Sequence, residues 1–190
     1  MSEFIDVVGL DPSMSNFGMV RGRLNIVTGT FSIIDIQLTT TAPDNKNKKK
    51  VRKNSDDLER ARKLQEAMKS FSEHCDLVCV EIPVGSQSAR AMASYGMCIG
   101  ILSSIDVPLI QVTPTEVKLA ATHNKLATKA DMIKWATELY PKAGWLTRTV
   151  KGKQEFTNAN EHLADAVAAI HAAVRTEQFT AVRNMLLKLI

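Results

Sequence analysis

The chain has few cysteines, no long apolar run and no sign of a secretory signal, and each of these shortages excludes a class of protein. Its three cysteines form no Cys-x-x-Cys pair, so we expect a reducing compartment. No stretch of about 18 consecutive apolar residues occurs, which excludes a transmembrane helix. The first residues are neither basic nor followed by a long apolar run, so no secretory signal is predicted. We therefore expect a cytoplasmic protein.

The composition that is present indicates an ordinary globular chain. Hydrophobic residues make up 45% of the sequence and charged residues 23%, and a length of 190 residues suits one domain spanning residues 1–190. The net charge of +4 is concentrated in one segment, because six basic residues lie between Lys46 and Lys53. The rest of the sequence holds 18 basic and 20 acidic residues. We interpret the basic loop, about residues 42–54, either as a solvated segment or as an arm that contacts phosphates.

Hydrophobic patterns along the chain predict a mixed α/β fold. Three strands joined by short turns predict an antiparallel meander, and two later apolar runs predict buried strands; these are residues 4–10, 17–24 and 30–38, then 77–80 and 107–112. Helices are predicted at about 55–73 and 88–104, after the caps Thr113 and Thr128, at about 160–176 and from about 177 on. Residues 141–159 are predicted to form a loop. This order of elements is typical of a sheet with helices packed on it.

Two of the predicted strands end on a carboxylate, and a predicted helix carries further candidates. Asp11 follows the first strand and Glu81 the fourth, where a carboxylate is costly to desolvate unless something pairs with it. On the helix near residue 160, Asp165 lies three residues after His162 and four after Glu161, so both share a face with it. If this helix begins beside the strand ends, several carboxylates and a histidine converge there.

Converging carboxylates of this kind predict a site for divalent cations. Close carboxylates repel one another at pH 7, and Mg²⁺ prefers a few carboxylates together with several waters. Two such ions about 3.5–4 Å apart can activate a water and stabilise the leaving oxygen of a phosphodiester. Each residue alone also has a simpler interpretation. Asp11 could open a turn, Glu161 could satisfy the helix dipole, and His162 could pack or lie at the surface.

Four short motifs follow one another along nearly the whole chain. They are Gly9-Leu10-Asp11-Pro12-Ser13 with Gly18-Met19-Val20, then Val78-Cys79-Val80-Glu81, then Pro114-Thr115-Glu116-Val117-Lys118 with Ala127-Thr128-Lys129, and last Asn160-Glu161-His162-Leu163-Ala164-Asp165-Ala166. In this order they resemble the motifs of RuvC-like Holliday junction resolvases. The basic loop and a terminal helix at about 177–190 look like additions to a compact member of bacteriophage or mobile-element type, which would act in a bacterial or phage-infected cell.

The resemblance implies a fold, an activity and a set of site residues. It implies an RNase H-like fold with a five-stranded sheet, three strands antiparallel and then two parallel, in a homodimer that nicks four-way DNA junctions symmetrically with Mg²⁺ or Mn²⁺. Asp11, Glu81 and Asp165 match metal-binding acids, and His162 stands where members carry Asp or His. Glu161 is a possible additional acid for the same site.

The resemblance also implies DNA contacts. Lys118 and Lys129 match basic residues beside the scissile strand, and the DNA would be left with 5′-phosphate and 3′-hydroxyl ends. If the basic loop contacts phosphates, Lys48, Lys49 and Lys50 are its candidate DNA-binding residues. No membrane partner and no small-molecule substrate are expected.

The sequence departs from the family pattern after the second motif. The aromatic residue that some members carry three residues after the glutamate is missing, since Glu81 is followed by Ile82-Pro83-Val84. Tyr95 could substitute for it, and a core or surface role for Tyr95 is equally consistent. One stripe of the helix after Glu81 is a candidate dimer surface, with core packing as the equal alternative; it holds Ala89, Ala93, Met97 and Ile101.

Functions of other classes are less well supported. An ATPase of RNase H-like fold needs phosphate loops rich in glycine and threonine, and the nine glycines form no such cluster. A catalytically weak module that binds branched DNA is the other alternative. A zinc site at His74, Cys75 and Cys79 lacks suitable ligand spacing. ATP turnover measured against junction cleavage discriminates between these functions.

Overall fold

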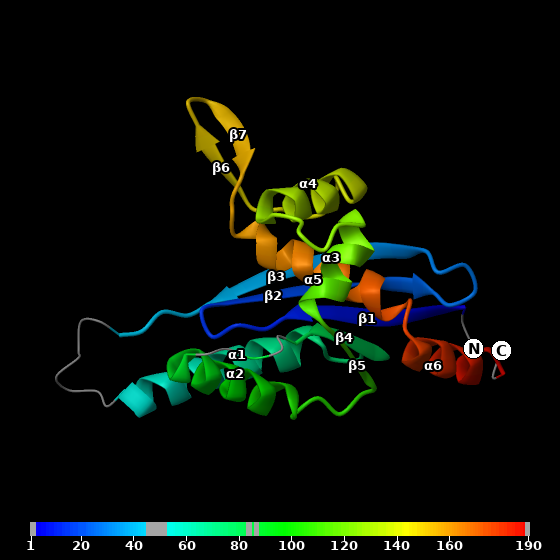
Figure 1. Ribbon diagram of the computed structural model, residues 1–190, viewed down its shortest axis with the longest axis horizontal. Coiled ribbons are helices and arrows are strands. Elements are labelled where there is room, and N and C mark those ends of the chain that lie inside the picture. The colour runs from blue at the N-terminus through cyan, green and yellow to red at the C-terminus, as the bar shows by residue number, and fades with distance from the viewer. Residues whose placement is uncertain (1–2, 45–52, 83–84, 86–87, 189–190) are drawn as a thin grey trace.

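A mixed five-stranded sheet forms the centre of the molecule in the computed structural model, which describes residues 3–44, 53–82, 85 and 88–188 (Figure 1). The strands are β1 (Phe4–Asp11), β2 (Asn16–Asn25), β3 (Phe31–Thr40), β4 (Leu77–Glu81) and β5 (Leu109–Val112), in the order β3-β2-β1-β4-β5. β1, β2 and β3 pair antiparallel, whereas β4 and β5 continue the sheet in parallel with β1. The predicted sheet of three antiparallel and two parallel strands is confirmed.

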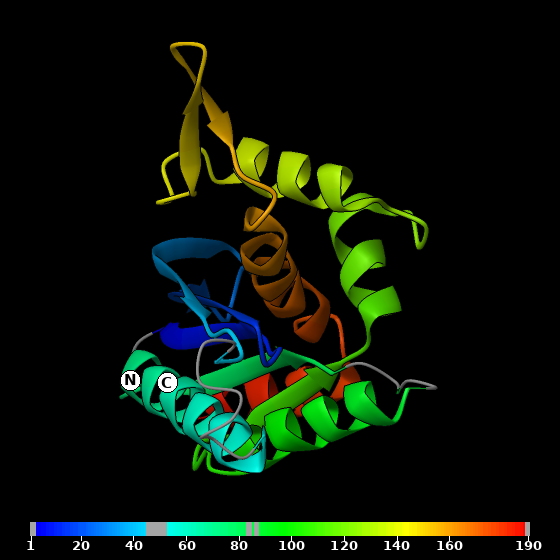
Figure 2. The same cartoon turned by 90° about the vertical axis from the view of Figure 1, so that its left-hand side faces the viewer.

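Helices cover both faces of this sheet (Figure 2). The helices α1 (Lys53–Phe71) and α2 (Ala89–Leu102) lie on one face. The other face carries α3 (Pro114–Thr122), α4 (Lys129–Leu139) and α5 (Asn160–Ala173), and Phe179 of α6 (Glu177–Leu187) joins the same core. No helix within the described ranges combines the length and apolar character needed to cross a bilayer.

Side chains along the central strands point alternately to the two faces of the sheet. The buried residues therefore form two hydrophobic cores, one on each face. On β1, Ile5 and Val7 belong to the core beneath α5, whereas Val8 and Leu10 belong to the core beneath α1 and α2. On β4, Leu77 and Cys79 face the α5 side, and Val78 and Val80 face the other. Successive side chains of a strand point to opposite faces. The residues that follow in the same phase, Asp11 and Glu81, therefore lie on the α5 side.

Two helix starts that were predicted from the sequence are confirmed. Thr113 caps α3 and Thr128 caps α4, each by accepting a hydrogen bond from the backbone N–H three residues later. The side chains of Glu116 and Asp131 accept a hydrogen bond from the cap backbone in return, which completes a capping box at each helix. These caps fix where the helices that carry Lys118 and Lys129 begin.

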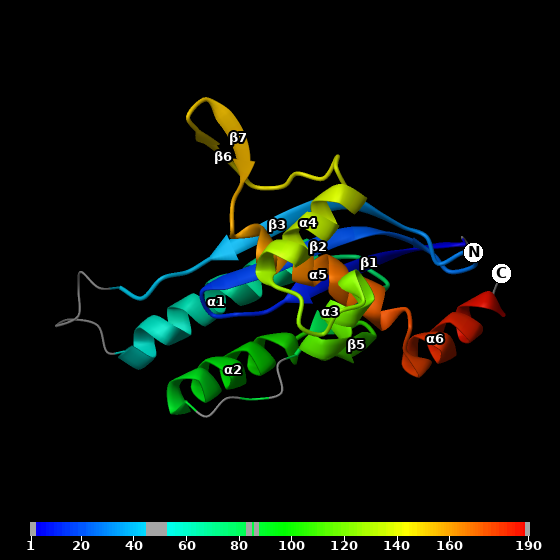
Figure 3. The ribbon, with the colours of Figure 1, turned by 45° about the horizontal axis from the view of Figure 1, so that its top comes forward.

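The prediction of a loop over residues 141–159 is wrong in its central part. Residues Thr147–Val150 form β6 and residues Lys153–Phe156 form β7, and the two strands pair as an antiparallel hairpin. Lys151 and Gly152 connect them with φ angles of 49° and 79°, the left-handed geometry of a type I′ turn. Figure 3 shows this hairpin standing away from the sheet, beyond α4 and α5.

The predicted stripe on α2 does not behave as one surface. Ile101 is buried in the core beneath α1 and α2, and Met97 is half-buried against it. Ala89 and Ala93 are exposed. Tyr95, the candidate replacement for the missing aromatic, is half-buried. The N-terminal part of α2 is therefore the part of this stripe that is free to meet a partner molecule.

Candidate functional site

The predicted acids Asp11 and Glu81 are brought side by side by the register of the sheet. Leu10 of β1 pairs with Val80 of β4 in parallel, and Asp11 and Glu81 are the next residues along each strand. Because the carboxyl ends of parallel neighbours lie at the same edge, both carboxylates point from one edge toward α5. They are the last residues of β1 and β4.

Two glycines allow α5 to lie directly on this edge. A Cβ atom built on Gly9 would lie 2.1 Å from the carbonyl oxygen of Ala166, and one on Gly18 would lie 2.1 Å from the carbonyl oxygen of His162. Real Cβ atoms essentially never approach backbone this closely, so only glycine fits at either position. Gly18 also pairs with Asp11 across β1 and β2. The close approach places the first turns of α5 over Asp11.

A continuous set of polar contacts joins the strand edge to α5 and α4. The His162 Nδ1 atom lies 2.6 Å from Asp11 Oδ2, in a pair whose side chains are only 18% and 16% exposed. On its other side, His162 Nε2 lies 3.4 Å from Glu161 Oε1. Lys129, at the start of α4, donates a hydrogen bond of 2.8 Å to the same Glu161 oxygen. The chain of contacts therefore runs Asp11, His162, Glu161, Lys129.

The acidic cluster, which we define as Asp11, Glu81, Glu161, His162 and Asp165, carries more buried negative charge than its neighbours offset. Burial raises the pKa of Glu81 to about 8, with Asp11 and Asp165 adding to the effect. Burial likewise raises the pKa of Asp165 to about 7, and Asp11 contributes further. The pKa of Asp11 is also raised by burial, although His162 opposes that change. Part of each shift comes from the neighbouring carboxylates, which repel one another when they are all ionised.

His162 and Lys118 supply positive charge to the acidic cluster. Burial lowers the pKa of His162, but the hydrogen bond and charge of Asp11, together with Glu161 and Asp165, outweigh burial and leave this pKa raised. The charge of Lys118 on α3 lowers the pKa of both Glu81 and Asp165. The structure thus places Lys129 against Glu161 and the charge of Lys118 near Glu81 and Asp165, whereas contact of these lysines with a scissile DNA strand stays a prediction. Lys48, Lys49 and Lys50 lie outside the described residues.

The donor set of the cluster fits a divalent cation in its chemistry. Carboxylate oxygens are the ligands that Mg²⁺ prefers, and a cation would offset the burial and the mutual repulsion that raise the pKa values of Glu81 and Asp165. Oε2 of Glu161 is buried and accepts no aligned hydrogen bond from the described residues, although Lys129 Nζ lies 2.8 Å from it. Within the described ranges, no three His, Cys, Asp or Glu side chains form a ready-made metal site.

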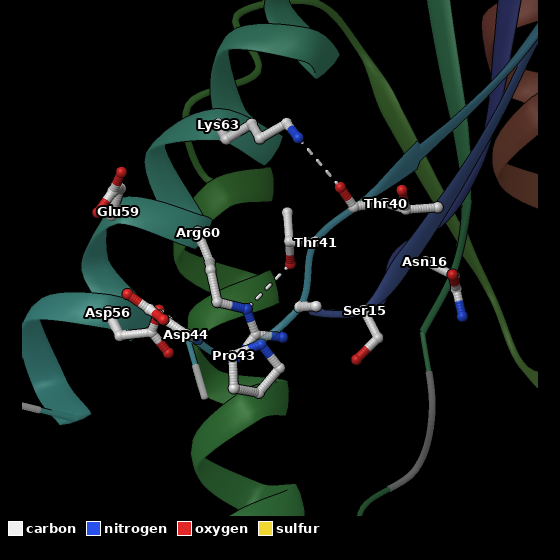
Figure 4. Close-up of a pocket in the computed structure, with 11 residues that line it drawn as sticks. Ser15, Asn16, Thr40, Thr41, Pro43, Asp44, Asp56, Glu59, Arg60 and Lys63 are labelled. Carbon is white, nitrogen blue, oxygen red and sulfur yellow. Dashed lines mark hydrogen bonds between the residues drawn. The ribbon is translucent and has the colours of Figure 1, made fainter. Parts of the chain in front are cut away.

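A separate cavity of about 800 Å³ lies between the start of α1 and the segments near Ser15 and Thr41, and no member of the acidic cluster lines it. Figure 4 shows Arg60 reaching from α1 to Thr41. Arg60 Nη2 also donates a hydrogen bond of 2.9 Å to the carbonyl oxygen of Met14. This buried guanidinium therefore fixes the turn that follows Asp11.

Arg60 also connects that turn to α2. Its Nη1 atom donates to Asp57 Oδ1 at 3.3 Å, and Asp57 accepts two further hydrogen bonds of 2.6 and 2.7 Å from Arg90 of α2. The sequence gives no signal for Arg60, because a single arginine on an amphipathic helix is typical of a solvated face. What distinguishes Arg60 is that its side chain is buried, and only the packed structure reveals this burial.

Comparison with solved structures identifies the fold. The chain is similar to RuvC of Thermus thermophilus, with a TM-score of 0.61 and 18% identity over 95% of this chain and 97% of that one. A complex of T. thermophilus RuvC with a Holliday junction substrate gives the same TM-score, with 16% identity over 88% of this chain and 92% of that one. Fowlpox virus resolvase, solved with Holliday junction DNA, gives 0.51 and 14% identity over 96% and 99%.

These likenesses are ones of structure. No protein-family profile matches the chain, and no curated protein matches it in sequence. The predicted resemblance to RuvC-like resolvases is confirmed for the fold, which is RNase H-like. The site residues Asp11, Glu81, His162 and Asp165 remain predictions, supported by their convergence at one edge of the sheet.

Proposed function

We propose that the protein is a Holliday junction resolvase, a metal-dependent endodeoxyribonuclease that nicks four-way DNA junctions symmetrically. The observation that carries the proposal is the convergence of Asp11, Glu81, Asp165 and His162, which come from β1, β4 and α5. The fold shared with RuvC and fowlpox virus resolvase supports it. Such an enzyme would act in DNA recombination and repair, in the cytoplasm of a bacterial or phage-infected cell.

Asp11, Glu81 and Asp165 would hold divalent cations, with His162 or Glu161 completing the set. Bound Mg²⁺, with Mn²⁺ as a substitute, would activate a water and stabilise the leaving oxygen of the phosphodiester. The contact of His162 Nδ1 with Asp11 keeps the imidazole within the acidic cluster. A neutral His162 can accept a proton from the attacking water, and its raised pKa makes that role dependent on pH.

Lys118 and Lys129 would bind phosphates beside the scissile bond. Lys129 is exposed, and its ammonium group is held at the acidic cluster by Glu161. Lys118 influences the pKa of Glu81 and Asp165, which indicates that its charge also reaches the cluster. Two cations flanking the carboxylates would attract the DNA backbone to a site that is otherwise acidic.

The proposal includes a homodimer built from one nuclease domain, residues 1–190, that carries the basic loop and α6 as additions. A four-way junction has two-fold symmetry, so two equivalent sites related by a two-fold axis would cut two strands at matching positions. The exposed N-terminal part of α2, around Ala89 and Ala93, is the candidate contact. Arg90 of the same helix connects, through Asp57 and Arg60, to the turn after Asp11.

The experiment is cleavage of matched four-way, three-way, flap and linear DNAs of the same arm sequences, with Mg²⁺ and with a chelator. We expect paired nicks in the four-way junction that require the cation, and no more than weak cutting of the linear duplex. Equal cutting of all four DNAs would contradict structure selectivity. ATP hydrolysis in the absence of any DNA cleavage would favour a nucleotide-hydrolysing function instead.

A further inference from the structure

The β6–β7 hairpin stands away from the body of the molecule, next to the helix that carries His162. Figures 1 and 2 show it rising from the end of α5, on the side opposite α1 and α2. It forms a two-stranded sheet of its own, and of its strand residues only Val150 is even half-buried. A two-stranded hairpin is at best marginally stable alone. A hairpin with so little buried surface adds little to the stability of the core, so we look for its role in contacts with another molecule.

The tip of the hairpin presents a positive charge at a conformational cost. Type I′ turns favour Asn-Gly or Gly-Gly, because both central residues need a positive φ. Here the first central residue is Lys151, with φ of 49°, a backbone conformation that is less favourable for lysine than for glycine. Lys153 follows the turn, and both side chains are exposed. The outermost part of the hairpin therefore carries two lysines.

The base of the hairpin is fixed to the acidic cluster by one buried side chain. Asn160 is fully buried, and its Oδ1 accepts a hydrogen bond of 2.9 Å from the backbone N–H of Leu146. Its Nδ2 atom donates to the carbonyl oxygens of Leu146 and Thr157, at 2.8 and 3.1 Å. Asn160 directly precedes Glu161 and His162. The base of the hairpin is thus held at a fixed position relative to the cluster, on both of its strands.

The two faces of the hairpin differ in chemistry. Cross-strand pairing places Arg148 with Glu155 and Val150 with Lys153 on one face. The other face carries Thr147 with the half-exposed Phe156, and Thr149 with Gln154. Arg148 and Glu155 are 3.9 Å apart and largely exposed, so their mutual attraction is weak. The hairpin therefore combines a basic tip with an uncharged face of two threonines, a glutamine and a phenylalanine.

We propose that the β6–β7 hairpin binds a duplex arm of the branched DNA, an inference that rests on the proposed function. A two-stranded β-ribbon fits the major groove of B-DNA, which is about 12 Å wide. Lys151 and Lys153 contact phosphates, and the face with Thr149 and Gln154 lies toward the base edges. Because Asn160 holds the base of the hairpin next to Glu161 and His162, a duplex bound by the hairpin has a defined position relative to the acidic cluster. The hairpin thereby sets which phosphate of the arm reaches Asp11.

The test removes the two charges while keeping the hairpin. In a Lys151→Asn/Lys153→Thr variant, asparagine suits the left-handed turn position and threonine suits a strand, so the hairpin should fold at least as well. The matched control is Lys69→Ala/Lys188→Ala, which removes two exposed lysines from the last turn of α1 and the end of α6. In Figure 1, α1 lies below the sheet and α6 at the right-hand end, whereas the hairpin stands above the sheet at the upper left.

The measurement is the dissociation constant for a four-way junction and for a linear duplex across a salt series without divalent cations. We expect the hairpin variant to bind both DNAs at least about fivefold more weakly near 0.1 M salt. Its slope of log affinity against log salt should fall by about 0.9 for each phosphate that is no longer neutralised. The control should match the wild type. Equally weakened binding in both variants would indicate a general charge effect and overturn the proposal.

The outcomes separate this proposal from the proposed function. A hairpin variant that binds both DNAs like the wild type overturns the hairpin contact, whatever the wild type cleaves. A wild type that binds duplex DNA through the hairpin but cuts no junction overturns the resolvase function and leaves the contact supported. A wild type without affinity for either DNA overturns both.

Discussion

The acidic cluster and the β6–β7 hairpin meet at Asn160, yet they are built in opposite ways. Backbone geometry fixes the cluster. The register of β1 and β4 positions Asp11 and Glu81, and Gly9 and Gly18 allow α5 to pack directly on the sheet. The hairpin has little such support, since it depends on one turn and on the hydrogen bonds of Asn160. Groups that must meet within hydrogen-bond distance lie where the backbone has no freedom. The proposed DNA contact lies on an exposed element whose sequence the core does not constrain.

The largest expected effect comes from removing a carboxylate of the cluster. Asp11→Asn, Glu81→Gln and Asp165→Asn each delete a ligand charge with almost no change in volume, so we expect cleavage to fall below detection while junction binding is retained. Cleavage assays paired with electrophoretic binding assays measure both properties. Cutting at the wild-type rate by any one variant would remove that residue from the site.

Substitution of His162 tests whether the imidazole takes part in the chemistry. His162→Ala should slow cleavage by about 10²- to 10⁴-fold, the range typical of a missing general base. His162→Asp should recover part of the rate, because a carboxylate can serve as a ligand or base at the same place. Single-turnover rates with saturating protein give the comparison. An unchanged rate in His162→Ala would move the role to Glu161, which shares the face of Asp165.

The glycine contacts give a test of how rigidly the cluster is held. Gly18→Ala places a methyl group against the carbonyl oxygen of His162, so α5 must shift, and we expect a loss of about 2 kcal/mol in the free energy of unfolding together with slower cleavage. Gly100→Ala is the matched control, since a Cβ there meets nothing within 4 Å. Its better helix propensity should add about 0.5–1 kcal/mol. Denaturant titration compares the two, and equal stabilities would contradict the close packing of α5.

The raised pKa values predict that the metal-free protein loses stability as the pH rises. Glu81 ordinarily titrates near 4.5 and Asp165 near 3.8, but in the folded protein they titrate with pKa values of about 8 and about 7. Between the ordinary and the raised values the folded state holds more protons than the unfolded chain, so its stability falls with increasing pH. His162, whose pKa is also raised, acts in the same direction.

Glu81→Gln should therefore be more stable than the wild type at pH 8, by about 4 kcal/mol, and much closer to it at pH 5. Glu66→Gln, at an exposed position of α1, is the control and should match the stability of the wild type at both pH values. Urea unfolding at both pH values in a chelator provides the measurement. Added Mg²⁺ should stabilise the wild type at pH 8 more than Glu81→Gln. A wild type that gains stability from pH 5 to pH 8 would contradict the crowding of these acids.

The smallest expected effect concerns the basic loop, which would be a second DNA-binding element besides the hairpin. Lys48→Ala/Lys49→Ala/Lys50→Ala should weaken binding to junctions and linear duplex alike, because phosphates alone carry no information on branching. The slope of log affinity against log salt should fall by up to about 0.9 for each phosphate that these lysines neutralise in the wild type. A slope that stays at the wild-type value would favour the interpretation of a solvated loop.

The acidic cluster could be predicted from the sequence because its residues lie at the ends of recognisable strands and on one face of a recognisable helix. Apolar runs that end on Asp11 and Glu81 indicate strand ends, and the spacing from Glu161 and His162 to Asp165 indicates one helical face. Gly9 and Gly18 could not be understood in the same way, since their role depends on the distance between α5 and the sheet. Arg60 was missed for a similar reason, because burial of an arginine depends on which segments pack around it.

The hairpin was missed because its sequence lacks the usual signals. Residues 147–156 hold no alternation of apolar with polar side chains, since neither face of the hairpin is buried. Its turn carries Lys151-Gly152, whereas Asn-Gly or Asp-Gly is the strongest short-range signal. A glycine between two short runs that contain Thr, Val and Phe was the remaining clue. Elements that do not contribute to a core leave little trace in hydrophobic periodicity.

The most direct test of the central claim, that the acidic cluster cuts branched DNA, maps the nicks strand by strand. A four-way junction labelled on each strand in turn is incubated with Mg²⁺ and either the wild type or Glu81→Gln, and the product ends are identified. We expect the wild type to nick two opposing strands at symmetry-related phosphates, leaving 5′-phosphate and 3′-hydroxyl ends, and Glu81→Gln to bind the junction without nicking it. Identical nicks from both proteins, or no nicks from the wild type, would contradict the claim.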